Sequence, residues 1–309
     1  MNAVAATSTA DRTAAANAAG RRGAEALSGT AFALPALLLL LVIYLVPLGM
    51  LVVLSATNYE LGALDWKWLG LANFQKALGD PVFRRSLVNT FLYVSIVLPG
   101  SVLLSLLIAI LVHARIRTRS FYEVVYFLPV TSTLIAMATV WQFILHPRLG
   151  PVNAAFKALG LPEIAFLSEP ALIIPTIAGI GLWQLIGFNM ILFLAGLSAI
   201  PRDLYDAAEI DGAGGAIDRF MKITWPGLGP TTMFVTVTTA ITAFKVFDTV
   251  AALTRGANGS EVLLYAIYLE GFQYFNVGYA AALTLIFLAF ILIFSIAQAF
   301  LIDRRVHYA

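Results

Sequence analysis

The sequence has no cysteine and only three histidines in 309 residues. Without cysteine the chain can form no disulfide and no thiolate metal site, and it has no cysteine nucleophile. His113, His146 and His307 lie far apart and show none of the spacings expected of a zinc site. The composition therefore excludes thiol chemistry and predicts no metal site in this chain.

Motifs for nucleotide binding and hydrolysis are also missing. No G-x-x-x-x-G-K-S/T segment is present, so the chain has no P-loop with which to bind ATP. G-x-S-x-G and H-E-x-x-H are absent too, and no serine–histidine pair suits nucleophilic catalysis. We therefore expect a chain that is not an enzyme, that binds no cofactor itself, and that has no nucleic-acid partner.

Charged residues make up only 12% of the chain, whereas hydrophobic residues make up 60% and the mean hydropathy is +0.88. A soluble domain could not bury so much apolar surface, so the composition predicts an all-α protein that crosses a membrane several times. Six apolar segments are long enough to span a hydrocarbon core of about 30 Å. These segments cover residues 31–56, 87–113, 121–145, 171–199, 231–253 and 280–302. The first is too long for the core of a signal peptide and is interpreted as an uncleaved span.

The distribution of basic residues predicts the orientation of the spans. Arg115, Arg117 and Arg119 fill the short loop after the second span, where no acidic residue is present, and Arg304 and Arg305 follow the sixth. Basic residues in the opposite loops are mixed with acidic ones. The positive-inside rule then places both termini in the cytoplasm. We expect three parts: a mobile cytoplasmic tail over residues 1–30, a six-helix transmembrane domain over 31–302, and a cytoplasmic C-terminal tail over 303–309.

Residues 201–230 form the only long polar segment between two apolar runs in the second half of the chain. Pro201 can occupy the first turn of a helix, and Gly212 can end that helix in the left-handed conformation. A second helix is predicted from about residue 214 to residue 224, and Pro226 and Pro230 are predicted to end it. The segment is therefore predicted to be a helix–glycine–helix hairpin on the cytoplasmic side.

The hairpin resembles the cytoplasmic coupling loop, often called the EAA loop, of permeases in binding-protein-dependent ABC importers. The motif of that family is E-A-A-x-x-D-G-A, a short spacer, and then F-x-x-I-x-x-P. The matching residues are Asp206, Ala207, Ala208, Asp211, Gly212, Ala213, Phe220, Ile223 and Pro226. Two features depart from the motif: Asp206 is one methylene shorter than the usual glutamate, and Gly214, Gly215 and Ala216 replace bulkier residues. Each glycine should destabilise the second helix by about 1 kcal/mol.

A second segment resembles the extracytoplasmic G-L-x-N-F…D-P-x-F…N-T pattern of the carbohydrate branch of these permeases. The matching residues are Gly70, Leu71, Asn73, Phe74, Asp80, Pro81, Phe83, Asn89 and Thr90. Taken one by one, Trp66, Trp68 and Phe74 are also compatible with ordinary interfacial aromatic residues, which need no special function. The ordered set as a whole favours the resemblance.

The resemblance implies the type I ABC importer permease fold, of the maltose and glycerol-phosphate permease type, in the inner membrane of a bacterium. It implies that the solute is a sugar or a sugar derivative. It also implies an assembly with a second, homologous permease, an extracytoplasmic solute-binding protein, and two ABC ATPase subunits that bind ATP and Mg²⁺. This chain would form half of the translocation path and couple to the ATPase subunits through residues 201–230.

An ion-gradient-driven secondary carrier is the alternative function. Such a carrier would need carboxylates or broken helices near the middle of the membrane, together with an internal repeat. Lys245 and Asp248 are the main polar pair of this kind within a predicted span, and no convincing repeat relates the two halves of the chain.

Polar residues inside apolar spans mark candidate positions along a water-filled path. Lys245 and Asp248, which follow Phe244 in the fifth span, are three positions apart and are predicted to share one helical face. Two interpretations remain open for this pair. The residues border the outer gate or a substrate site, or they form a buried ion pair that fixes helix packing.

Amide and indole side chains form a second candidate set for the substrate path. Its members are Trp141, Gln142, Trp183, Gln184 and Asn189. Amides can hydrogen-bond sugar hydroxyls, and aromatic rings can pack on the apolar face of a sugar. The alternative is hydrogen bonding between helices, which is common in helical membrane proteins.

Overall fold

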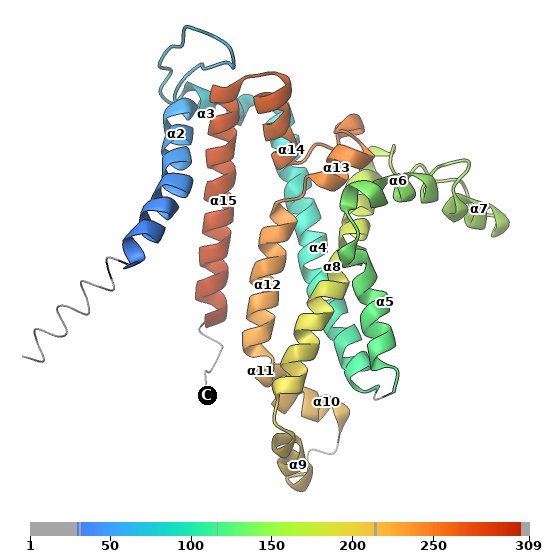
Figure 1. Cartoon of the computed structure of the whole chain (residues 1–309). Helices are drawn as coiled ribbons and strands as arrows, with labels where there is room; N and C mark the ends of the chain where they lie inside the picture. The colour runs from blue at the N-terminus through green and yellow to red at the C-terminus, as the bar shows by residue number, and fades with distance from the viewer. Residues whose placement is uncertain (1–29, 31, 116, 213–214, 304–309) are drawn as a thin grey trace, which may run out of the picture. The chain divides into compact units, whose positions relative to one another are not determined.

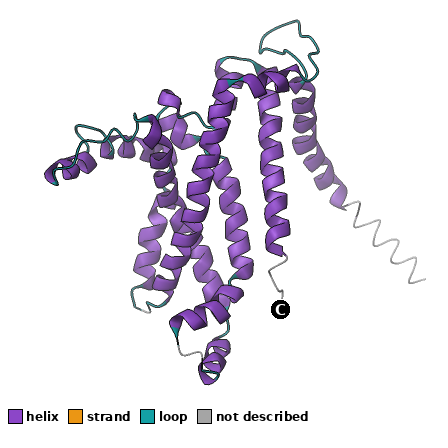
Figure 2. Ribbon diagram, turned by 180° about the vertical axis from the view of Figure 1, so that it is seen from behind, coloured by secondary structure: helices purple, strands orange, loops and turns teal. Residues whose placement is uncertain are grey.

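The computed structural model describes residues 30, 32–115, 117–212 and 215–303. Regular structure in these ranges is helical (Figure 2), apart from one β-bridge between Thr57 and Trp68, which confirms the predicted all-α class. Most of both predicted tails, residues 1–29 and 304–309, lies outside the described residues. Ala213 of the predicted hairpin motif and its neighbour Gly214 also lie outside them.

Figure 1 labels the α-helices in chain order, and η denotes short π-helical or 3₁₀ segments, which are not labelled in the figure. They are η1 (Leu41–Leu45), α2 (Val46–Ser55), α3 (Ala72–Gly79), α4 (Pro81–His113), α5 (Arg119–Thr131), α6 (Leu134–Ile144), α7 (Pro151–Ala158), α8 (Pro170–Ala199), α9 (Arg202–Ile210), α10 (Ala216–Arg219), η2 (Phe220–Thr224), α11 (Trp225–Gly227), α12 (Gly229–Phe244), α13 (Asp248–Leu253), η3 (Ala257–Gly259), α14 (Leu263–Tyr268), η4 (Leu269–Gln273) and α15 (Val277–Asp303).

The chain divides into two compact units, Met1–Leu54 and Ser55–Ala309. The first unit contains nearly all of the apolar helix Phe32–Ser55, whose large side chains are exposed along its length. A helix that is apolar all round requires lipid or other helices as its surroundings. The remaining helices belong to the second unit.

Within the described ranges, five helices are long and apolar enough to cross a membrane: Phe32–Ser55, Pro81–His113, Pro170–Ala199, Gly229–Leu253 and Val277–Gln298. A sixth span results if α5 and α6 are counted together. The third predicted span is therefore broken, because the two helices are bent by 103° relative to each other. The backbone becomes extended at Ser132 and Thr133, soon after Pro129, which cannot donate a helical hydrogen bond.

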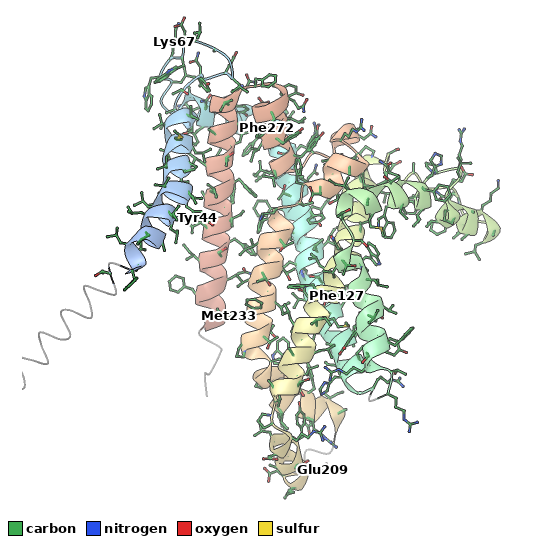
Figure 3. All side chains as sticks on the ribbon, viewed as in Figure 1. Tyr44, Lys67, Phe127, Glu209, Met233 and Phe272 are labelled. Carbon is green, nitrogen blue, oxygen red and sulfur yellow. The ribbon has the colours of Figure 1, made fainter. Side chains whose placement is uncertain are left out.

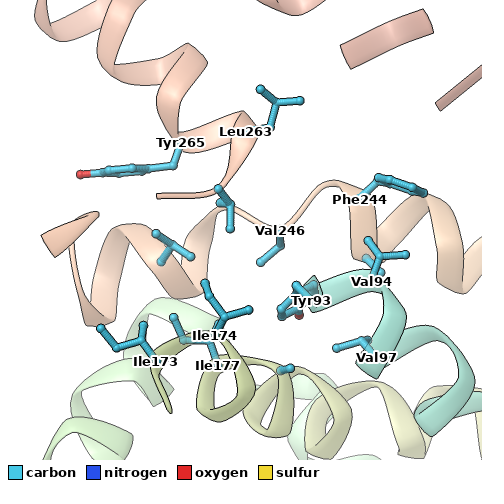
Figure 4. Packing of buried hydrophobic residues seen from close by; sticks show 14 of the residues in the cluster. Tyr93, Val94, Val97, Ile173, Ile174, Ile177, Phe244, Val246, Leu263 and Tyr265 are labelled. Atoms are coloured by element: carbon cyan, nitrogen blue, oxygen red, sulfur yellow. The ribbon is translucent and has the colours of Figure 1, made fainter. Parts of the chain in front are cut away.

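Helices α4, α8 and α12 pack against one another at the centre of the second unit. Two buried apolar clusters hold them together. The outer cluster, part of which is drawn in Figure 4, includes Tyr93, Val97, Ile177, Phe244 and Leu263. The second cluster lies nearer the hairpin and includes Leu106, Met190, Phe193, Leu228 and Val235. We call it the inner cluster.

Helical structure continues through the prolines that follow the hairpin. α10, η2 and α11 run without interruption from Ala216 to Gly227, and α12 begins at Gly229. Pro226 and Pro230 lie in the first turns of α11 and α12, where a helix needs no backbone donor. The prediction that these prolines end the second helix is therefore wrong.

Candidate functional site

The hairpin turns at Gly212, which has a φ of +86°. α9 ends at Ile210, and Asp211 is its C-terminal cap residue. A Cβ added to Gly212 would meet no atom within 4 Å, so glycine is required by the left-handed backbone conformation and not by lack of space. This geometry confirms that Gly212 ends the first helix of the hairpin.

The base of the hairpin is anchored to the membrane helices. The hydroxyl groups of Tyr205 on α9 and Thr224 on η2 share a hydrogen bond of 2.9 Å. Tyr205, Phe220 and Ile223 also pack against the inner cluster. Phe220 and Ile223 of the matched motif therefore connect the hairpin to α4, α8 and α12.

The rest of the hairpin exposes large apolar side chains, although it is a polar segment. Ile210 is 87% exposed and Ile217 is 81% exposed. We call four of the exposed side chains, Leu204, Ile210, Ile217 and Met221, the hairpin apolar face; Trp225 is also exposed. Exposed apolar side chains grouped on one loop mark a surface for a protein partner. Glu209 marks this end of the second unit in Figure 3.

The short motif residues of α9 lie beside this face. Asp206, Ala207 and Asp211 are exposed, and Ala208 is half-buried. Small side chains allow a partner surface to approach the α9 backbone closely, and the two carboxylates can pair with basic groups on such a partner. The described part of the motif thus contributes both an anchored base and an accessible surface.

Two of the predicted path residues hydrogen-bond between helices. Asn189 on α8 is 1% exposed, and its Nδ2 donates to Thr239 Oγ1 on α12 at 2.9 Å. Gln142 on α6 donates from Nε2 to the carbonyl oxygens of Ala252 and Leu253 at 3.0 and 3.2 Å. For both residues the geometry favours the interhelical alternative.

Three aromatic candidates pack against other rings. Phe244 is buried, and its ring centroid lies 5.0 Å from that of Phe294 and 5.7 Å from that of Phe91. Trp141 and Trp183 meet edge to face with centroids 5.4 Å apart, and both remain half-buried. Phe244 therefore supports packing, whereas the indole pair keeps part of its surface accessible.

Gln184, Lys245 and Asp248 line one cavity of about 190 Å³, together with Phe247. α12 ends before Lys245 and α13 begins at Asp248, so the prediction that these two residues share a helical face is wrong. Among the described residues they form no ion pair with each other, and both are exposed. This arrangement suits a hydrated path better than a buried ion pair.

A row of aromatic rings next to this cavity was missed by the sequence-based prediction of the site. Phe247 lines the cavity, and its ring centroid lies 5.3 Å from that of Tyr268. Tyr268 in turn stacks on Phe272 at 5.6 Å, and Tyr265 lies 6.1 Å from Tyr268. Burial raises the pKa of Tyr265. The i, i+3, i+7 spacing of residues 265, 268 and 272 was the available signal.

The predicted extracytoplasmic motif forms a hydrogen-bonded framework at the end of the second unit opposite the hairpin. Asn73 Nδ2 donates to the carbonyl oxygens of Ser55 and Thr57, both at 2.8 Å. Asp80 caps the N-terminus of α4 with one carboxylate oxygen and accepts a 2.8 Å hydrogen bond from the Tyr279 hydroxyl with the other. The motif therefore joins the start of α15 to the start of α4.

The same motif ties α4 to the loop before α14. Asn89 Nδ2 donates to the carbonyl oxygens of Gly259 and Glu261, both at 2.8 Å. The Leu263 N–H donates to Thr90 Oγ1 at 2.9 Å. These bonds connect segments that are far apart in the sequence, so they hold α4 and the loop before α14 together at the outer end.

Comparison with protein-family models matches residues 77–308 to the family described as "Binding-protein-dependent transport system inner membrane component". Among curated proteins, the chain is 32% identical over 272 residues to a probable ABC transporter permease protein of Pyrococcus horikoshii, covering 84% of this chain and 93% of that protein. It is 30% identical over 277 residues to the sn-glycerol-3-phosphate transport system permease protein UgpA of Agrobacterium fabrum, covering 89% of this chain and 94% of that protein.

Among solved structures, the fold is similar to a chain of the bacterial alginate ABC transporter in complex with an alginate pentasaccharide-bound periplasmic protein. The TM-score is 0.80 at 21% sequence identity, covering 90% of this chain and 95% of that chain. A second structure of a bacterial ABC transporter for alginate import gives a TM-score of 0.78 at 22% identity, with 89% and 94% of the two chains covered. At these identities the likeness concerns the fold.

Proposed function

Because the chain belongs to the family of inner membrane components of binding-protein-dependent transport systems, we propose that it is a transmembrane subunit of an ATP-driven importer for a sugar or a sugar derivative. The observation that carries this proposal is the hairpin that turns at Gly212. Its base packs on the membrane helices, and the hairpin apolar face is exposed. The named solutes of two similar proteins, sn-glycerol-3-phosphate and alginate, support the solute class.

The hairpin transmits movement between ATPase subunits and the spans. The hairpin apolar face docks on ATPase subunits, which bind ATP and Mg²⁺ in place of this chain. Tyr205, Phe220 and Ile223 pack on side chains of α4, α8 and α12, so displacement of the hairpin moves these helices together. Alternating access follows when closure of the ATPase subunits opens the path to the outside and hydrolysis resets it.

The substrate path runs past the cavity lined by Gln184, Lys245 and Asp248. An amide, an ammonium group and a carboxylate can hydrogen-bond the hydroxyl groups of a sugar. Phe247 and the Trp141–Trp183 pair offer aromatic surface for the apolar face of a sugar ring. This side-chain chemistry suits a polyhydroxylated solute.

The other subunits of the proposed assembly supply the parts of the importer that this chain does not contain. A second, homologous permease forms the other half of the path, and an extracytoplasmic solute-binding protein delivers the solute. By the positive-inside rule, the arginines at positions 115, 117 and 119 support a cytoplasmic location of the hairpin and of both termini. The outer framework around Asn73 and Asn89 then faces the binding protein.

An ion-gradient-driven carrier is supported less well. The bend between α5 and α6 is a feature that such carriers share. The matched family, however, depends on a binding protein, and the hairpin with its exposed apolar face has no role in a carrier that works alone.

The experiment that tests the proposal is purification of the tagged chain from its native membrane, followed by reconstitution of whatever is recovered with it. We expect a P-loop ATPase and a second permease in the purified complex, and uptake into proteoliposomes that requires ATP and the binding protein. Recovery of the chain alone, with uptake driven by an ion gradient in the absence of ATP, would contradict the proposal.

A further inference from the structure

A large cavity lies between the hairpin and the ends of the membrane helices, away from the substrate path. Its volume is about 860 Å³, which is in the range of small-molecule binding sites. Its walls come from the ends of α4 and α8, the start of α5, and both helices of the hairpin. The motif analysis assigned no role to this space.

The charged residues of this cavity are mostly basic. Arg119, Arg202 and Arg219 line it together with His113, and Asp206 is the one acidic residue among the lining side chains. With histidine neutral, the described lining residues carry an excess of two positive charges, although Glu123 and Glu209 pair with Arg119 and Arg219 from outside the lining. Arg119 and Arg202 are also the first residues of α5 and α9, where the helix dipoles add partial positive charge.

The arginines are only partly neutralised by the protein. Arg119 donates from Nε to Glu123 at 2.7 Å, which leaves its two terminal nitrogens available to a ligand. Arg202 is exposed and has no ion pair within the described residues, including with Asp206 one turn along α9. Arg219 forms an ion pair with Glu209 at 3.8 Å, so Arg119 and Arg202 are the arginines on which a ligand site depends. Guanidinium groups arranged in this way favour an anion with several acceptor oxygens.

We propose that this cavity binds the phosphate group of an anionic molecule at the cytoplasmic surface and so stabilises the hairpin against the membrane helices. The proposal rests on the proposed function for the cytoplasmic orientation of the hairpin. Arg119 belongs to α5 and Arg202 to α9, so a phosphate held between them links the hairpin to the transmembrane helices. The ligand would thereby modulate coupling without touching the ATP site.

Two sources can supply a phosphate at this position. The cavity lies at the ends of the candidate membrane spans α4 and α8, and basic pockets between helices on the cytoplasmic side suit anionic lipids. A soluble phosphorylated metabolite would use the same arginines. Both sources share the phosphate chemistry, so the experiment has one arm for each.

In the first arm, the intact complex is reconstituted in nanodiscs of equal parts phosphatidylglycerol and phosphatidylcholine, and the lipids retained after extraction are counted by native mass spectrometry. In the second arm, the complex in neutral detergent with phosphatidylcholine alone is titrated with inorganic phosphate in a calorimeter. Arg202→Gln should weaken binding by roughly tenfold, the effect of losing one charge-assisted contact. Arg119→Gln combined with Arg202→Gln should abolish it.

Arg115→Gln is the matched control, since it removes an exposed positive charge from the same loop region but does not line the cavity. Retention of phosphatidylglycerol that is lost in the cavity variants and kept in the control identifies a lipid site. Phosphate binding with the same pattern, in the absence of lipid retention, identifies a soluble ligand.

No phosphate-specific binding in either arm, or equal loss in Arg115→Gln, would overturn the proposal. If the double variant does not assemble, Arg202→Gln alone decides the result, because it replaces an exposed side chain at a helix start. Recovery of ATPase subunits in the same preparations reports separately on the proposed function.

Discussion

At the outer end of the second unit, Asn73, Asp80, Asn89 and Thr90 all hydrogen-bond to distant parts of the fold. At the opposite end, the hairpin is attached through its base, and beyond that base it exposes large apolar side chains around a glycine turn. Both ends carry a recognisable motif, but the motif residues act differently. At the outer end they hold helices to one another, whereas in the hairpin Phe220 and Ile223 pack on the helices and Asp206, Ala207 and Asp211 are exposed.

This difference predicts which property each end controls. Substitutions in the outer framework should lower the stability of the chain, because they remove buried hydrogen bonds or close packing. Substitutions in the exposed part of the hairpin should leave stability nearly unchanged and weaken assembly with ATPase subunits. Measuring both properties for each variant tests the comparison directly.

The largest loss of stability is expected for Gly278→Ala at the start of α15. A Cβ at Gly278 would overlap the carbonyl oxygen of Thr57, which is backbone and cannot move aside easily. We expect a loss on the order of 3 kcal/mol, seen as a lower melting temperature of the purified chain. Gly79→Ala is the control, since a Cβ there meets no atom within 4 Å. Equal melting temperatures for the two variants would contradict the claim that close packing at Gly278 stabilises the outer framework.

Asn89→Asp should destabilise the chain by about 2 kcal/mol, because it keeps the side-chain shape but removes the two N–H donors. The new carboxylate would face the carbonyl oxygens of Gly259 and Glu261. Asn258→Asp is the matched control at an exposed position without a side-chain hydrogen bond among the described residues. Thermal unfolding of both variants gives the comparison, and a stable Asn89→Asp chain would show that the framework is dispensable.

Lys245 and Asp248 lie between the two ends and should show little energetic coupling. Their side chains form no ion pair, so a double-mutant cycle with Lys245→Gln and Asp248→Asn should give a coupling energy below about 0.5 kcal/mol in thermal unfolding. Uptake of solute should fall in each single variant, because both residues line the proposed path. A coupling energy well above this value would restore the ion-pair interpretation.

The smallest stability change is expected in the hairpin apolar face. Ile210→Ser combined with Ile217→Ser replaces two exposed side chains, so the free energy of unfolding should change by less than about 0.5 kcal/mol. Recovery of ATPase subunits with the tagged chain should fall strongly, because apolar contact area is lost. A clear drop in melting temperature with full recovery of ATPase subunits would show that the hairpin apolar face stabilises the chain and does not bind ATPase subunits.

Sequence reasoning succeeded where one residue type has a strong local preference. Glycine at position 212 is needed for a positive φ, and long apolar runs predict spans irrespective of their neighbours. Such features depend on a few consecutive residues, which a sequence displays directly.

The sequence-based predictions failed where a break in a helix depends on packing. Pro226 is compatible with a helix end and with a first turn, and the π-helical η2 before it allows the helical path to continue. The break between Phe244 and Asp248 separates Lys245 from its expected partner, although the apolar run continues across it. The bonds of Asn89 to Gly259 and Glu261 join residues whose proximity only the fold reveals.

The measurement that tests the central claim most directly compares Gly212→Asp with Gly160→Asp. Both glycines have positive φ, +86° and +73°, and both have open space around the missing Cβ, so the two substitutions impose similar local strain and the same charge. Each tagged variant is purified from its membrane, its ATPase subunits are quantified, and its melting temperature is recorded. The account predicts similar melting temperatures, with ATPase subunits lost from Gly212→Asp and retained by Gly160→Asp. Full retention of ATPase subunits and of ATP-driven uptake by Gly212→Asp would contradict it.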